Sequence, residues 1–146
     1  MPSPQVQNYD PGLVITTIAA YPVVGGYAPG TYIKVSRRTE SFRDDAGAQG
    51  DVVRTRSRDK RGDIELTLLR TAAANDYLTG LLLADENVGG SIVPITISDL
   101  NGTTRAFGAE CWITKPPDME EATDAIHRLW HFAVANLETF IGGNTL

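Results

Sequence analysis

The sequence predicts a single, mainly β domain that carries one α-helix and one long charged segment. Three observations predict this class. Short stretches of alternating apolar and polar residues recur along the chain, 14 Gly and 8 Pro supply frequent turns, and residues 72–86 show helical rather than strand spacing. Because the chain has 146 residues, 42% of them apolar, and no repeat or linker divides it, we assign one domain, 1–146.

Two strands are predicted before the charged segment. Residues 13–19 follow a turn at Asp10 and Pro11 and include the β-branched residues Val14 and Ile15. Residues 31–38 alternate between apolar and polar side chains, which is typical of a half-buried strand.

Residues 37–62, here called the arm, concentrate charge. They hold 8 of the 13 Lys and Arg residues against 5 of the 18 Asp and Glu residues, so the arm carries +3 and the rest of the chain −8. Two strand-like halves, 39–43 and 51–57, flank Gly47 and Gly50. This pattern predicts a projection that pairs with complementary charge on another chain, and a disordered charged loop fits the composition equally well.

After the arm, residues 63–69 alternate as a strand with one solvated face, and the period then changes to that of a helix over 72–86. Thr71 is the predicted N-cap, and the glycines at 89–90 end the helix. Gly80 weakens this helix by about 1 kcal/mol relative to alanine, so packing must hold it.

Residues 92–100 and 103–114 form a predicted hairpin. They meet at Asn101 and Gly102, a pair typical of a type I′ turn because both of its central residues need a positive φ. Pro116 and the proline after it end the second strand.

The C-terminal segment 119–140 fits two structures. Its apolar residues have helical spacing over several turns, and Trp130, Phe132 and Val134 also alternate as in a strand. Periodicity alone favours the helix.

Composition excludes several classes of protein. The single cysteine, Cys111, cannot form an intramolecular disulfide and is interpreted as a core residue in a reducing compartment. A pI near 4.9 argues against gripping nucleic acid through its phosphates. The N-terminal residues show no export signal, and the apolar stretch 13–24 is too short to span a bilayer, so we expect a chain that stays in the cytosol or leaves by host lysis.

No catalytic, cofactor or metal motif emerges, which predicts a protein that is not an enzyme and has no cofactor. The GxGxxG, GxxxxGK[ST], HExxH, CxxC and GxSxG patterns do not occur. His127 and His131, with Asp124 as a third ligand, could meet at a zinc ion only on a helix, because on a strand the two rings would be about 13 Å apart. The acids Asp118, Glu120, Glu121 and Asp124 are interpreted as a solvated face.

Several short phrases, in order and at matching distances, resemble one known family. The matches are Ser41 and Phe42; Gly47 and Gly50; Val52, Val53, Arg54 and Arg56; Asp59, Lys60 and Gly62; residues 66–69; Asn75, Asp76 and Leu78; residues 99–104; Trp112, Ile113 and residues 115–117; Arg128 and Trp130; and residues 142–144. The chain resembles the bacteriophage tail tube proteins over residues 9–144. It departs from them at 72–74, where Ser-Pro is usual, and at Leu129, where a polar residue is usual.

The resemblance implies a fold and a role. It implies two packed antiparallel sheets in a sandwich or barrel, one flanking helix, and a strand rather than a helix at the Arg128–Trp130 segment. It also implies a virion tail protein that assembles in the host cytoplasm into hexameric rings. These rings would stack into a tube that contacts the sheath, tape measure, baseplate and terminator proteins, and through which DNA passes without stable membrane binding.

Within that family the arm is the expected contact between subunits. The predicted interface residues are Phe42, Arg43, Arg54, Arg56, Arg58, Lys60 and Arg61, with Phe42 as the apolar anchor. An acidic lumen would repel the DNA duplex. The alternatives are a tube subunit of a contractile injection system, a capsid or head–tail adaptor ring, and a monomeric β-barrel that binds a small molecule.

Overall fold

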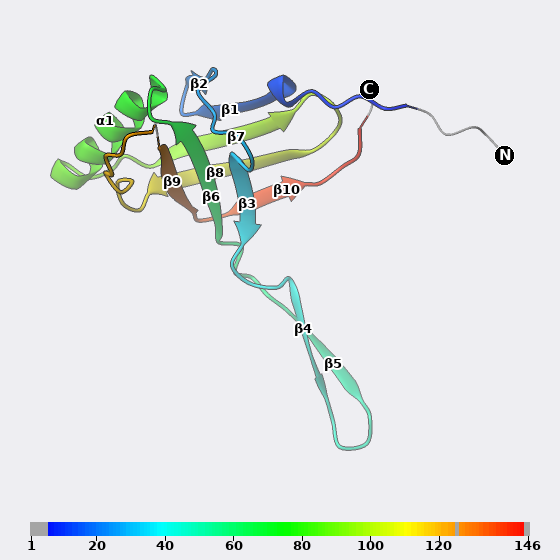
Figure 1. Ribbon diagram of the computed structural model, residues 1–146. Helices are drawn as coiled ribbons and strands as arrows, with labels where there is room; N and C mark the ends of the chain where they lie inside the picture. The colour runs from blue at the N-terminus through cyan, green and yellow to red at the C-terminus, as the bar shows by residue number, and fades with distance from the viewer. Residues whose placement is uncertain (1–5, 125, 145–146) are drawn as a thin grey trace.

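The computed structural model describes residues 6–124 and 126–144 and shows a β-rich domain with one projecting hairpin (Figure 1). After the short 3-10 helix η1 (Pro11–Leu13) come β1 (Val14–Ile18), β2 (Tyr21–Val23), β3 (Ile33–Arg37), β4 (Phe42–Ala46), β5 (Val52–Arg56), β6 (Gly62–Leu69), α1 (Ala74–Asn87), β7 (Val93–Asp99), β8 (Arg105–Ile113), β9 (His127–Val134) and β10 (Leu137–Phe140). No helix in the described part of the chain is long and apolar enough to cross a membrane.

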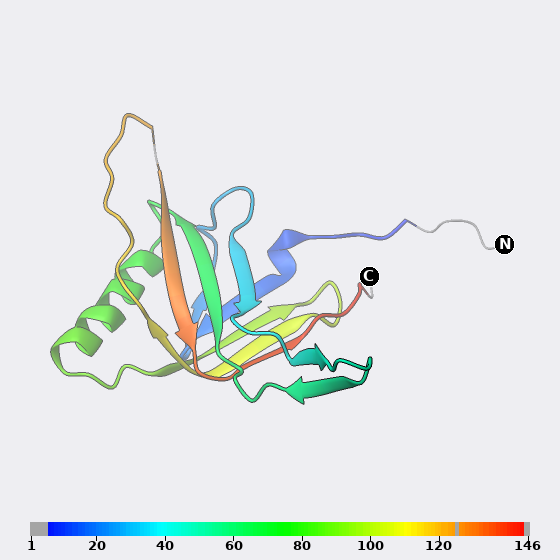
Figure 2. The ribbon, with the colours of Figure 1, turned by 90° about the horizontal axis from the view of Figure 1, so that it is seen from below.

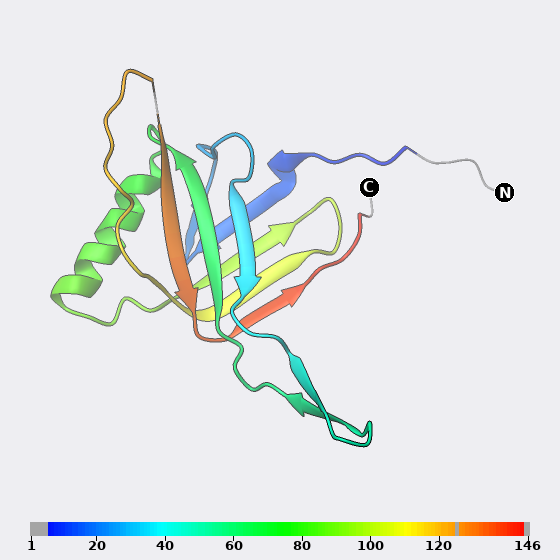
Figure 3. The same cartoon turned by 60° about the horizontal axis from the view of Figure 1, so that its bottom comes forward.

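The body is one antiparallel sheet folded over on itself. Seven of its eight strands follow the order β2-β1-β7-β8-β9-β6-β3, and the eighth, β10, pairs with β8 outside this path. The fold-over occurs along β8, because its residues 105–108 pair with β10 whereas its residues 111–113 pair with β9. Figure 3 shows the resulting layers, β3-β6-β9 over β1-β7-β8-β10. The predicted mainly β fold of two packed antiparallel layers with one flanking helix is confirmed.

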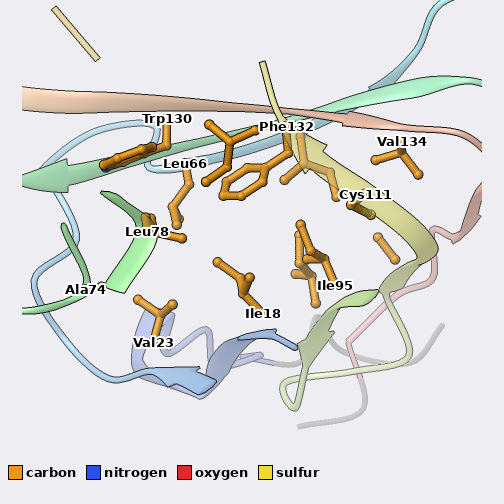
Figure 4. Close-up of a cluster of buried hydrophobic side chains, with 14 of the residues drawn as sticks. Ile18, Val23, Leu66, Ala74, Leu78, Ile95, Cys111, Trp130, Phe132 and Val134 are labelled. Carbon is orange, nitrogen blue, oxygen red and sulfur yellow. The ribbon is translucent and has the colours of Figure 1, made fainter. Parts of the chain in front are cut away.

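The core lies between these layers. Trp130, Phe132 and Leu66 enter it from one layer, and Ile18 and Ile95 from the other (Figure 4). Helix α1 packs its buried stripe of Ala74, Leu78 and Leu82 against the same core. Each fully buried side chain of this size stabilises the fold by about 1.5–3 kcal/mol, so burial between the layers is the main force that holds the sheet folded. As predicted, Cys111 is a buried core residue.

The C-terminal segment is a strand, so the helix favoured by periodicity is wrong. In β9, Trp130, Phe132 and Val134 alternate inward and are buried, and β9 pairs with β6 along its whole length. Tertiary pairing with β6 decides the matter, since a strand in this position buries every second residue. The strand implied by the resemblance is confirmed.

Helix α1 starts later than predicted and without the predicted cap. Ala73 is its N-cap residue and makes no side-chain capping bond, so Thr71 is not the cap. Instead, the Asn75 amide donates to the carbonyls of Leu69 and Ala72 at 3.0 and 3.1 Å. Its Oδ1 accepts the indole N–H of Trp130 at 2.9 Å, which joins the helix start to the core. The helix ends before Gly89 and Gly90, as predicted.

The β7–β8 connection is not the predicted type I′ turn. Neither Asn101 nor Gly102 has a positive φ, and the connection covers residues 100–104. Asn101 is fully buried, accepts the Asp10 backbone N–H at 2.9 Å and donates to the Asp10 carbonyl at 2.9 Å. This side chain ties the N-terminal segment to the sheet, and that long-range role sets the local conformation.

Candidate functional site

The arm projects from the body as an ordered β-hairpin (Figures 1 and 2). Strands β4 and β5 pair antiparallel with Phe42 opposite Arg56 and Ala46 opposite Val52, and all ten residues are exposed. The Ser57 amide extends the ladder by donating to the Ser41 carbonyl at 2.8 Å. The two predicted strand halves are therefore present, the first shifted to Phe42–Ala46, and the alternative of a disordered loop is wrong.

The root of the arm, residues 37–38 and 59–61, is tied to the body. Arg38 pairs with Asp63 at 2.9 Å, and its Nε also donates to that carboxylate. Arg37 donates to the Leu137 carbonyl at 2.9 Å. Because these bonds reach two different strands of the body, β6 and β10, they set the direction in which the hairpin leaves the sheet.

A second ion pair lies inside the root. Arg61 donates from Nε and Nη2 to the two carboxylate oxygens of Asp59, each at 2.9 Å. These hydrogen bonds, together with one from the Arg61 backbone, lower the pKa of Asp59 from 3.8 to about 2. The pKa of Asp63 is also lowered, chiefly by its hydrogen bonds from Arg38. Both carboxylates are therefore ionised at neutral pH and hold the root.

Asp63 is also bound by a histidine. His131 Nε2 lies 2.8 Å from Asp63 Oδ1, and His131 Nδ1 lies 2.8 Å from the Thr114 hydroxyl. His127 and His131 stand four positions apart on strand β9, so the helical zinc geometry considered from the sequence does not occur. Within residues 6–124 and 126–144, no group of three or more His, Cys, Asp or Glu residues could hold a metal ion.

The charge of the arm divides between the root and the hairpin. Residues 39–58 contain four basic and four acidic side chains, so the hairpin is neutral and the root carries the whole +3. Arg38 and Arg61, two of the root cations, are already paired within the chain. Asp45 and Asp51 stand nearest the turn, Asp44 faces Arg54 across the hairpin, and Arg43, Arg56 and Arg58 stand nearer the body. The hairpin thus presents an acidic tip rather than a basic surface.

The predicted interface residues fall into three settings. The Arg54 guanidinium lies over the Phe42 ring, with its Cζ 4.3 Å from the ring centroid. Phe42 is also directly opposite Arg56, and all three side chains lie on the same face of the hairpin. Arg43 lies on the other face, because successive residues of a strand alternate. Arg61 is used inside the root. The side chains of Arg43, Arg56, Arg58 and Lys60 make no ion pair with any described residue and are exposed.

The predicted solvated acids are indeed on the surface. Asp118, Glu120, Glu121 and Asp124 are all exposed in the segment between β8 and β9. Glu121 pairs with Arg70 and, at 3.6 Å, with Arg128. The connection between β8 and β9, which carries these acids, runs past α1 on the side of the body away from the hairpin (Figure 3).

Sequence reasoning missed an apolar groove. It has a volume of about 430 Å³ and lies where the folded sheet stays open, between β3 and the layer formed by β1, β7, β8 and β10. Its apolar walls are Val14, Ile33, Val35, Ile97, Ala106 and Ile141. The alternation in residues 31–38 was the sequence signal closest to this groove, because it indicates a strand with one apolar face. Only the order of strands in the sheet shows that this face borders an opening.

The fold of this chain is similar to that of chains in solved assemblies of contractile injection systems. One match is the tube-terminating cap of the anti-feeding prophage, with a TM-score of 0.59, 10% identity, and 97% of each chain covered. A second is a sheath/tube terminator of an extracellular contractile injection system, PVC, in the extended state, with a TM-score of 0.58, 12% identity, and 97% of this chain and 98% of that one covered. A third is a sheath–tube complex of that system, with a TM-score of 0.55, 12% identity, and 91% of each chain covered.

The chain shares the fold of these injection-system proteins. At 10–12% identity the likeness shows the fold alone. No protein-family model and no curated protein matches the sequence.

Proposed function

We propose that this chain is a structural subunit of a phage tail tube, in which hexameric rings stack into a hollow conduit through arm contacts. The observation that carries the proposal is the hairpin itself. It is fully exposed, and its root is held by bonds to β6 and β10. The fold shared with chains of a tube-terminating cap, a sheath/tube terminator and a sheath–tube complex of contractile injection systems supports it.

An isolated hairpin of this kind needs a partner. Two-stranded hairpins are marginally stable in water, and this one leaves both strand edges unpaired and exposes Phe42, Val52 and Val53. A neighbouring subunit removes these groups from water, and each buried apolar side chain contributes about 1.5–3 kcal/mol to association before ordering costs. The arm is thus explained by assembly better than by the stability of one chain.

The conduit is proposed to carry DNA without binding it. Outside the arm the chain has a net charge of −8, and a duplex carries one charge per about 1.7 Å. An acidic wall therefore repels the duplex, and the genome moves through with little friction. In the virion, the tube would contact the sheath, tape measure, baseplate and terminator proteins.

A terminator ring is a second candidate function, favoured by two of the structures named above, a tube-terminating cap and a sheath/tube terminator. Such a ring closes one end of a tube and does not stack on copies of itself. A tube subunit of an injection system with a protein cargo, or a head–tail adaptor ring, would use the same fold. A tube subunit forms long assemblies, whereas a terminator or adaptor forms single rings. The two kinds of tube differ in their cargo, which is DNA in one and protein in the other.

The test uses the purified full chain. We expect concentration-dependent growth by light scattering and tubes by electron microscopy. The double variant Arg54→Glu with Arg56→Glu should keep folded rings but lose tube growth, because it reverses the charge of β5 beside Phe42. Lys34→Glu with Lys115→Glu makes the same charge change on exposed sites outside the arm and should leave growth unchanged.

Three results would count against the proposal. Tubes of normal length from the arm variant would show that the arm does not join rings. Single rings of the unchanged chain at every concentration would favour the terminator or adaptor. A monomer at every concentration would leave only a β-barrel that acts alone.

A further inference from the structure

The groove beside β3 is an unfilled opening in the core. It exists because the sheet order ends at β3, whose outer edge pairs with no other described strand. Ile97 and Ala106 form its floor, and Ile33 and Val35 form the wall on the β3 side. Contact with water raises the free energy of apolar walls of this kind, and an apolar segment that enters the groove lowers it.

The hairpin tip has the matching properties. Val52 is 69% exposed and Val53 63% exposed, and because they are adjacent in β5 they point to opposite faces. Three of the four residues in the turn between the strands are small, Gly47, Ala48 and Gly50, so the tip is narrow. One inserted tip can therefore contact both walls of the groove with its two valines.

Charge agrees with this pairing. The tip carries Asp45 and Asp51, and the exposed Arg105 lines the groove without an ion pair to any described residue. The one acid among the described lining residues, Asp99, accepts hydrogen bonds from the backbone N–H and the side-chain amide of Asn101. A tip entering the groove would bring these carboxylates towards Arg105. An exposed pair of this kind adds at most a small stabilisation, but it favours one orientation of the tip.

A chain cannot fill its own groove with its own tip. The Arg38–Asp63 and Arg61–Asp59 pairs fix the root, and the hairpin leaves the body beyond the end of β3 (Figures 1 and 3). No residue of its own hairpin, 39–58, lines the groove. From residue 39 to residue 47 the extended strand reaches roughly 30 Å, far enough to meet another subunit.

We propose that the groove between β3 and the β1-β7-β8-β10 layer receives the hairpin tip of a second copy of this chain, with Val52 and Val53 against its apolar walls. This inference rests on the proposed function and names the surface that accepts the arm. It makes the contact heterologous, because the tip and the groove are different surfaces, and such contacts propagate along a polymer.

Cysteine cross-linking tests the contact directly. In the variant Val53→Cys with Ile141→Cys, oxidation of the assembled chain should give a ladder of covalent multimers. The matched control is Val53→Cys with Val88→Cys, because Val88 is 88% exposed and Ile141 85% exposed, but Val88 lies at the end of α1 outside the groove. The native Cys111 is fully buried and does not compete.

We expect the cross-linked fraction of the groove variant to exceed that of the control and of each single variant by about tenfold or more, since contact raises the effective concentration of the two thiols to about the millimolar range. Assembled tubes with equal cross-linking in both double variants, or with none, would overturn the groove contact and leave the proposed tube intact. A chain that never assembles would overturn the proposed function and this inference together.

Discussion

A methyl group added at Gly62 should loosen the joint between the arm and the core. Gly62 opens β6, opposite Arg37, and an ideal Cβ there would lie 2.9 Å from the Ser36 carbonyl oxygen and 2.9 Å from Leu137 Cβ, and would also contact Leu137 Cδ2. Since Ser36 O belongs to the backbone and Leu137 is fully buried, neither can withdraw freely. Gly62→Ala should lower the free energy of unfolding by about 1–3 kcal/mol.

For a chain of this length, 1 kcal/mol corresponds to roughly 3–4 °C in Tm, so Gly62→Ala should melt about 3–10 °C lower. Gly80→Ala is the matched control, because a Cβ on Gly80 meets nothing within 4 Å and the residue lies exposed in α1. It should melt about 2–3 °C higher through helix propensity. Circular dichroism of dilute, unassembled protein measures both changes.

The two variants are expected to change the Tm in opposite directions, so each has a result that would refute the reasoning. A Tm of Gly62→Ala equal to that of the unchanged chain would mean that the start of β6 is not packed against Leu137 as described. A loss of stability in Gly80→Ala would mean that the outer face of α1 is covered.

Three further predictions concern single groups. Asn75→Ala should lower the free energy of unfolding by about 1–3 kcal/mol in urea, because the buried Trp130 indole N–H loses its acceptor. The Asp59 contribution to stability should be present above pH 4 and disappear as the pH falls to about 2, because the pKa of Asp59 is lower in the folded chain than in the unfolded one. The Arg61 backbone N–H donates to the Asp59 carboxylate at 3.1 Å, so its NMR signal should shift with pH with a midpoint near pH 2. Burial raises the pKa of Cys111 to about 11, so a thiol reagent at pH 8 should label the chain only after unfolding.

Each of these has its own control. Asn75→Asp keeps the oxygen acceptor and should retain more stability than Asn75→Ala; equal losses would argue that the amide donors alone matter. Asp59→Asn should abolish the titration of the Arg61 amide, and a midpoint near 3.8 in the unchanged chain would contradict the ion pair. Rapid labelling of the folded chain would contradict the burial of Cys111.

Local pattern was sufficient for most of the β-structure. Alternation located β3 and β6 to within two residues, because each has one face towards the core and one in water. The two segments of the predicted hairpin, 92–100 and 103–114, match β7 and β8 to within two residues. The short strand β2 was missed, since its central Pro22 is tolerated only at the edge of a sheet and reads as a turn.

The candidate site was predictable in part. The charged composition and the two glycines of the arm indicated a projecting hairpin, and the structure shows one. The sign of the projecting surface was not predictable, because the excess positive charge stays at the root and is partly paired there. The role of this surface in contacts between subunits stays a prediction.

The sequence by itself determined the class of the domain, the position of its helix, the burial of Cys111 and the existence of the arm, because each depends on residues that are close in the chain. The tertiary structure alone decided that the segment after residue 126 is a strand and that Asn101 is buried. It also decided that the groove beside β3 stays open. These depend on partners far away in sequence, such as β6 for β9 and Asp10 for Asn101, and no local period records which distant residues will meet.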